Sequence, residues 1–187
     1  TKGKVDDDLR MVLVDVYMET NQFDKAAEEL RVLISVNRDK DVMIKYARVL
    51  FELGKSNDAL SLVQEVKSKD PENLEALMMI GKIRTGQKKY DDAIETYKEI
   101  LYIDQNYAPA LCERANIYLI QGKYQWAQTF YDRALKADPK NAMVHLGLAR
   151  LSKKQKDYAG YSEHLEKARK LDPQNREIQE EIRSVKR

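Results

Sequence analysis

The sequence predicts an all-α protein built as a stack of antiparallel helix pairs. The main evidence is a repeat, since Ala59, Ala93 and Ala127 are each 34 residues apart and Tyr90 and Tyr124 are separated by the same step. A fixed period of this size is typical of a solenoid, in which each repeat packs only on its neighbours. The 187 residues also contain only 7 glycines and 4 prolines, too few turn residues for a protein of many β-strands.

The clearest copy of the repeat is Gly122–Pro139, which reads GKYQWAQTFYDRALKADP. Within it, Ala127, Tyr131 and Ala134 are spaced to lie on one face of a helix. Because two of the three are alanines, we expect a neighbouring helix to come very close to this face. Related copies occupy residues 23–33, 87–105 and 155–173.

These features resemble the tetratricopeptide repeat (TPR) family, whose unit is two antiparallel helices with small residues at fixed positions. The small position of the first helix falls on Val14, Ala47, Gly81, Ala115 and Ala149. The alanine of the second helix falls on Ala26, Ala59, Ala93 and Ala127, and the closing proline on Pro71, Pro139 and Pro173. The resemblance implies a right-handed superhelical solenoid and covers nearly the whole chain.

The chain departs from the family pattern at a few positions. Tyr161 stands where alanine is expected, Arg38 and Gln105 stand where proline is expected, and Ser56 stands where an aromatic residue is expected. We therefore expect the fifth repeat, which holds Tyr161, to pack differently from the others.

The repeat predicts a single solenoid domain over residues 1–187. Its repeats are expected at residues 7–39, 40–73, 74–107, 108–141 and 142–175, followed by a capping helix at 176–187. The predicted helix pairs are 6–20 with 23–36, 41–52 with 56–68, 73–84 with 90–103, 108–121 with 124–137, and 142–154 with 158–171. Asp-Pro steps at 70–71, 138–139 and 172–173 are expected to end one helix before the next begins.

The two ends of the chain are predicted to differ. In the first helix, Leu9, Leu13, Val16 and Tyr17 are expected on the buried side, and no polar-backed cap precedes them. The segment 176–187 keeps helical periodicity and is otherwise charged, as expected of a cap at the end of a stack.

Composition excludes several classes of protein. Charged residues make up 34% of the chain, with a formal net charge of +2, which is typical of solvated helix faces and lacks the basic stripe of a nucleic-acid binder. The single cysteine, Cys112, excludes an internal disulfide framework. No apolar run approaches the ~20 residues that span a bilayer, and no charged-then-apolar segment predicts secretion. We expect a cytoplasmic location and, because the chain begins without methionine, a piece of a longer protein.

No arrangement of residues predicts catalysis. The two histidines, His145 and His164, belong to different helices at non-equivalent repeat positions and form no HExxH motif. No glycine-rich phosphate loop occurs, and no carboxylate lies in an apolar run. We therefore predict no catalytic, cofactor-binding or metal-binding residues, and a protein that is not an enzyme.

The candidate binding residues lie at positions 5, 9 and 12 of the first helices, which the resemblance implies line a concave groove. We call this set the first-helix stripe: Met11, Ile44, Arg48, Phe51, Met78, Lys82, Cys112, Asn116, Leu119, Leu146 and Arg150. Position 5 is apolar in all five repeats, and position 9 is basic in three of them. The stripe predicts a seat for a peptide or amphipathic helix with acidic residues. The alternative is that position 5 packs each first helix within its own repeat.

Trp126 is a candidate contact outside the stripe. It precedes the alanine of its helix, at a position that usually points to solvent, and exposed tryptophans are common at binding surfaces. The alternative is that its ring lies over the neighbouring loop.

The sequence thus favours a protein-interaction scaffold that binds a peptide or helix in its groove. One alternative is a self-assembling TPR scaffold that forms homo-oligomers, for example the magnetosome-associated type on a bacterial organelle membrane, with membrane association only through partners. A weaker alternative, a helical-repeat nucleic-acid binder, needs a basic face, whereas Asp15, Glu52 and Glu113 are mixed with the basic residues.

Overall fold

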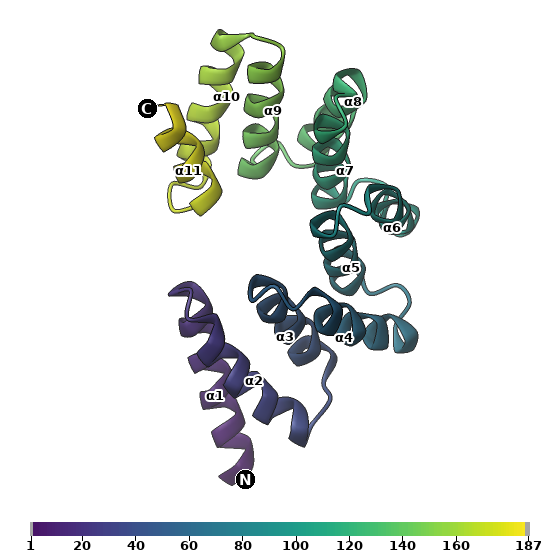
Figure 1. The fold of residues 1–187 in the computed structure, drawn as a ribbon, viewed down its shortest axis with the longest axis vertical. Helices are drawn as coiled ribbons and strands as arrows, with labels where there is room; N and C mark the ends of the chain where they lie inside the picture. The colour runs from purple at the N-terminus through teal and green to yellow at the C-terminus, as the bar shows by residue number, and fades with distance from the viewer. Residues whose placement is uncertain (1, 186–187) are drawn as a thin grey trace. The chain divides into compact units, whose positions relative to one another are not determined.

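The computed structural model describes residues 2–185, with side chains described for residues 6–184 (Figure 1). This range contains eleven helices and no strand. The helices are α1 (Lys2–Glu19), α2 (Phe23–Val36), α3 (Lys40–Glu52), α4 (Ser56–Lys69), α5 (Leu74–Gly86), α6 (Tyr90–Ile103), α7 (Ala108–Ile120), α8 (Tyr124–Ala137), α9 (Ala142–Lys154), α10 (Tyr158–Leu171) and α11 (Arg176–Val185).

The chain divides into two compact units, Thr1–Thr96 and Tyr97–Arg187, with the boundary inside α6. In the first unit, α1 packs on α2 and α3 on α4, and the pairs are joined where α2 meets α3 and α4 meets α5. In the second unit, α7 packs on α8 and α9 on α10, with α8 against α9 and α11 against α10 (Figure 1). The predicted all-helical fold of adjacent helix pairs is confirmed.

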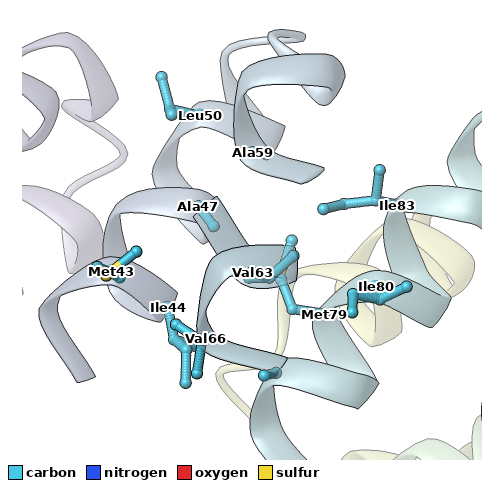
Figure 2. Packing of buried hydrophobic residues seen from close by; sticks show 11 residues of the cluster. Met43, Ile44, Ala47, Leu50, Ala59, Val63, Val66, Met79, Ile80 and Ile83 are labelled. Atoms are coloured by element: carbon cyan, nitrogen blue, oxygen red, sulfur yellow. The ribbon is translucent and has the colours of Figure 1, made fainter. Parts of the chain in front are cut away.

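The small residues of the repeat lie at the helix contacts. Ala26, Ala59, Ala93 and Ala127 are fully buried, as are Ala47, Ala115 and Ala149. Figure 2 shows one such core, in which Ala47 of α3 and Ala59 of α4 are surrounded by Val63, Ile80 and Ile83. Because an alanine carries only one carbon beyond the backbone, helices can approach closely there, and the larger neighbours fill the remaining space.

A left-handed residue joins the two helices of each repeat. Asn21, Gly54, Lys88, Gly122 and Lys156 all have positive φ, between 56° and 75°. Glycine adopts this conformation freely, whereas a lysine side chain is strained there. The turn is therefore set by its place in the repeat and not by glycine alone.

An Asp-Pro-x-Asn motif starts three of the helices. At residues 70–73, 138–141 and 172–175 the asparagine Nδ2 donates to the aspartate at 3.1 Å. The same asparagine accepts backbone N–H groups in the first turn of the next helix, as Asn141 does from Met143 and Val144. The motif thus ends one helix and caps the following one.

Two expectations for α1 were wrong. The helix begins at Lys2, not Asp6. Leu9, Leu13 and Val16 are exposed, while the buried side is formed by Val14 together with the partly buried Tyr17. The other helices begin and end within two residues of the predicted bounds, except that residues 186 and 187 of the predicted cap lie outside the described residues.

Candidate partner-binding face

The apolar members of the first-helix stripe are mostly core residues. Ile44, Met78, Cys112 and Leu146 are buried, and Met11 packs partly buried against the cluster formed by α1, α2 and α3. Packing inside each unit therefore explains why position 5 is apolar in all five repeats.

Position 12 is more accessible. Phe51 and Leu119 are half-buried. A Cβ added at Gly86 would lie 2.9 Å from the Phe51 ring, so the ring packs directly over the end of α5. In the second unit, Leu119 and Arg150 line a cleft of about 690 Å³ between α7 and α9.

Position 9 forms ion pairs with position 6 of the following repeat. In the first unit, Lys45 Nζ lies 2.6 Å from Asp15 Oδ1. In the second unit, Arg150 Nε lies 3.1 Å from Glu181 Oε2, so the same pair of positions is bridged with the charges reversed. The two residues of each pair are 30 or 31 positions apart, so the pairing can be found in the sequence once the repeats are aligned.

Arg48 differs from these two residues. It is exposed, and the residue at position 6 of the following repeat is the buried, uncharged Met79. No acidic side chain in the described part of the chain forms an ion pair with Arg48. Lys82, at position 9 of the third repeat, is also exposed.

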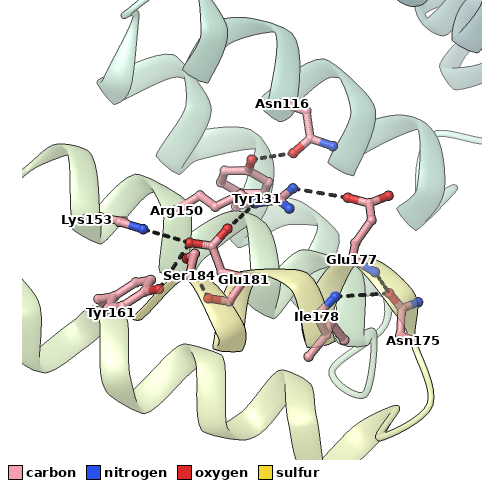
Figure 3. Close-up of polar contacts among 10 residues, drawn as sticks. All are labelled: Asn116, Tyr131, Arg150, Lys153, Tyr161, Asn175, Glu177, Ile178, Glu181 and Ser184. Carbon is pink, nitrogen blue, oxygen red and sulfur yellow. Dashed lines mark hydrogen bonds and ion pairs between the residues drawn. The ribbon is translucent and has the colours of Figure 1, made fainter. Parts of the chain in front are cut away.

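Asn116, at position 9 of the fourth repeat, is used inside the second unit. The Tyr131 hydroxyl donates to Asn116 Oδ1 at 2.6 Å (Figure 3). Asn116 Nδ2 in turn donates to Glu113 at 3.2 Å. Tyr131 is fully buried, and this burial raises the pKa of its phenol. The amide therefore positions a buried tyrosine instead of facing a partner.

Arg150 is held by the terminal helix (Figure 3). It donates to Glu181 at 3.1 Å and to Glu177 at 3.2 Å, both on α11. Glu181 also accepts from Lys153 and from the Tyr161 hydroxyl, each at 3.0 Å. Burial opposes ionisation of Glu181, but these hydrogen bonds outweigh it and hold the pKa of the carboxyl below its usual value.

Tyr161 thus has a role that the sequence did not predict. It replaces the expected small residue, remains buried, and ties α10 to α11 through Glu181. The Lys153 ammonium lies 5.0 Å from the centre of its ring.

The histidines also meet, although their repeat positions are not equivalent. His145 Nδ1 and His164 Nδ1 are 3.3 Å apart, and the rings are stacked. Burial lowers the pKa of both imidazoles, and the pKa of His145 is lowered further by His164. Within the described residues, no group of three metal-ligating side chains comes together.

Trp126 is 58% exposed. Its ring centre lies 6.1 Å from that of Tyr118, which in turn stacks on Phe130. The guanidinium of Arg114 lies over the Phe130 ring at 4.1 Å. Trp126 is therefore anchored at one edge and open to solvent elsewhere.

None of the helices among residues 2–185 combines the length and apolar character needed to cross a bilayer.

Comparisons with known proteins agree with this geometry. Two family models described as tetratricopeptide repeat match residues 50–114 and 108–141. No curated protein is significantly similar in sequence. Among solved structures, TTC0263, a thermophilic TPR protein of Thermus thermophilus, has a TM-score of 0.82 at 19% identity, covering 95% of this chain and 97% of that one.

Two further structures share the fold. MamA from Desulfovibrio magneticus RS-1, from residue 41 to its end, has a TM-score of 0.64 at 16% identity over 91% of this chain and 97% of that one. A tetratricopeptide repeat protein of Parabacteroides merdae ATCC 43184 has a TM-score of 0.64 at 18% identity over 93% and 70%. The 34-residue period, the antiparallel helix pairs and the likeness to these structures together define a helical-repeat solenoid. Residues 50–141 thus carry tetratricopeptide repeats, and the likeness of fold to solved tetratricopeptide repeat proteins extends over nearly the whole chain.

Proposed function

We propose that the protein is a non-catalytic interaction scaffold that binds a peptide or amphipathic helix with acidic residues along the exposed part of the first-helix stripe. The observation that carries this proposal is Arg48. Asp15 and Arg150, at the equivalent position, form ion pairs with position 6 of the next repeat, whereas Arg48 is exposed and its position 6 counterpart is the uncharged Met79. A basic group of this kind attracts a carboxylate from outside the chain.

Helix α11 supports the same chemistry from within the chain. It is an acidic amphipathic helix that lays Ile178 into the core and holds Arg150 with Glu177 and Glu181, one turn apart. A partner helix with two glutamates at this spacing would reach Arg48 and the exposed Lys82 of the first unit in the same manner.

A synthetic peptide spanning residues 174–187 is a suitable probe. We expect it to bind the protein with micromolar affinity, about −8 kcal/mol, in a calorimetric titration. Arg48→Glu combined with Lys82→Glu should abolish this binding without unfolding the chain. A peptide with glutamine in place of Glu177 and Glu181 should bind at least tenfold more weakly.

Two controls separate this site from other basic surfaces. Arg31→Glu changes an exposed arginine of α2 outside the stripe and should leave the affinity unchanged. Arg150→Glu tests whether the peptide instead displaces α11. Unchanged affinity of the Arg48 and Lys82 double variant, or loss of binding only in the Arg150 variant, would contradict the proposal.

A further inference from the structure

The first helix carries an uncovered apolar face. Leu9, Val12, Leu13 and Val16 are spaced at i, i+3, i+4 and i+7, and they are 58%, 60%, 43% and 47% exposed. Apolar side chains at this spacing form one continuous stripe along a helix. We call these four residues the α1 stripe.

Later repeats bury the equivalent face. In α3 the corresponding residues Val42, Tyr46 and Val49 pack against the cluster formed by α1 and α2. The residues that correspond to Val16, namely Val49, Ile83, Ile117 and Leu151, are all fully buried or nearly so. In every described junction within a unit, this face of a first helix meets the second helix of the pair before it: α2 with α3, α4 with α5, and α8 with α9. The α1 stripe is therefore shaped to pack on the second helix of such a pair.

One second helix of this chain is only partly covered. Ile178 and Ile182 of α11 pack on the core formed by α9 and α10, whereas Tyr158, Ser162 and Arg169 of α10 are exposed. There α10 and α11 border a cleft of about 760 Å³, which we call the end cleft. Its apolar lining comes from Tyr158, Tyr161, Leu165 and Ile182. Tyr158 is exposed although it is a large aromatic residue.

The charges of the two surfaces are complementary. Helix α1 contains five acidic residues, Asp6, Asp7, Asp8, Asp15 and Glu19, and three basic residues, Lys2, Lys4 and Arg10. Arg10 is already paired with Glu29. Lys153, Arg169 and the neighbouring Lys170 lie at the end cleft. They are paired with two carboxylates, Lys153 with Glu181 and both Arg169 and Lys170 with Glu166, so three positive charges face two negative ones and the cleft keeps a small positive excess. An acidic helix is therefore favoured there over a basic one.

We propose that the α1 stripe of one copy docks in the end cleft of a second copy. The contact joins two different surfaces, so each added copy leaves one stripe and one cleft free, and the assembly grows as an open chain. This contact does not depend on the first-helix stripe, and a chain that binds no acidic peptide would still assemble.

Light scattering after size exclusion, over a hundredfold range of concentration, tests the proposal. We expect the average mass to rise with concentration and to pass that of a dimer. Val12→Gln with Val16→Gln should give a monomer, because it removes the apolar contact from the stripe. Ser162→Glu with Arg169→Glu should also give a monomer, because it places acidic groups in the cleft opposite an acidic helix.

Mixing the stripe variant with the cleft variant is the most direct test of the contact. One retains an intact cleft and the other an intact stripe, so their mixture should form a 1:1 dimer and nothing larger. Matched controls with the same spacing, Val32→Gln with Val36→Gln on α2 and Thr129→Glu with Lys136→Glu on α8, should assemble as the unaltered protein does. Circular dichroism checks that all four variants fold.

Three results would overturn the proposal. The unaltered protein could remain a monomer at every concentration. The mass could stop at a dimer that the cleft variant still forms, which would mean that two α1 stripes pair with each other. The mixed variants could fail to combine although both are folded. None of these results bears on peptide binding at Arg48, so the two proposals fail independently.

Discussion

The buried hydroxyl of Tyr131 reaches Asn116 at 2.6 Å because residue 147 has no side chain. A Cβ at Gly147 would clash with Cε1 of the Tyr131 ring and would lie 2.6 Å from its hydroxyl oxygen. Helices α7, α8 and α9 thus meet at one point. Tyr131 of α8 passes Gly147 of α9 and donates a hydrogen bond to Asn116 of α7. Asn116, at position 9 of the fourth repeat, therefore has a hydrogen-bond partner in Tyr131 and takes part in no ion pair.

Gly147→Ala should therefore destabilise the protein, although glycine-to-alanine changes in helices usually stabilise by about 1 kcal/mol. The fully buried ring has no room to move, and overpacking of this kind costs about 1–3 kcal/mol. Urea unfolding of the variant measures the loss. Tyr131→Leu in the same background should recover part of it, because the shorter side chain makes space for the alanine. A Gly147→Ala variant as stable as the parent would show that the ring is free to shift.

The left-handed turns allow a gain in stability. Lys88 and Lys156 have φ of 59° and 63° at the place where Gly54 and Gly122 stand in other repeats. A residue with a side chain costs about 1–2 kcal/mol in this conformation, and the greater freedom of glycine in the unfolded chain offsets about half of that. Lys88→Gly and Lys156→Gly should each raise the free energy of unfolding by about 0.5–1 kcal/mol.

Thermal unfolding of each lysine variant checks this prediction. Lys55→Gly is the matched control, because Lys55 is exposed beside the corresponding turn and has an ordinary φ of −85°. It should lower stability through backbone entropy alone. If all three variants lose stability alike, the turns at 88 and 156 carry no strain.

The helix pairs and the helix ends, which recur in each repeat, could be predicted from the sequence. Ala59, Ala93 and Ala127 mark contacts between helices that pack the same way in each repeat, so their period located the helix pairs. The Asp-Pro steps likewise gave the helix ends, because proline cannot continue the helix that precedes it. These signals are local and do not depend on which repeat holds them.

Features that depend on a particular neighbour could not be predicted in this way. Leu9, Leu13 and Val16 have helical spacing, but their burial requires a preceding helix pair that is not among the described residues. Ile44 and Leu146 belong to the predicted binding stripe, yet both are buried, because helical spacing does not tell whether an apolar side chain faces its own repeat or a partner. The binding role of Arg48, Lys82 and Trp126 stays a prediction, since nothing yet tests it.

The His145–His164 contact predicts that the protein is less stable in mild acid. Burial lowers the pKa of both imidazoles in the folded state. The cationic Lys167 lowers both pKa values further, whereas Glu163 raises them. The unfolded chain, with histidine pKa values near 6.5, therefore binds more protons than the folded chain as the pH falls below that value. Stability from the neutral pair is fully present above about pH 6.5 and is lost as the pH falls through the folded pKa values.

Urea unfolding at pH 7.5 and pH 5.5 measures this loss, and His164→Gln is the variant that isolates it. The glutamine amide can bond His145 and does not titrate, so the difference in unfolding free energy between the two pH values should shrink relative to the unaltered protein. Carboxylates such as Glu163 titrate in both proteins, and their contribution largely cancels in this comparison. An equal difference in the two proteins would mean that the stacked pair titrates as exposed histidines do.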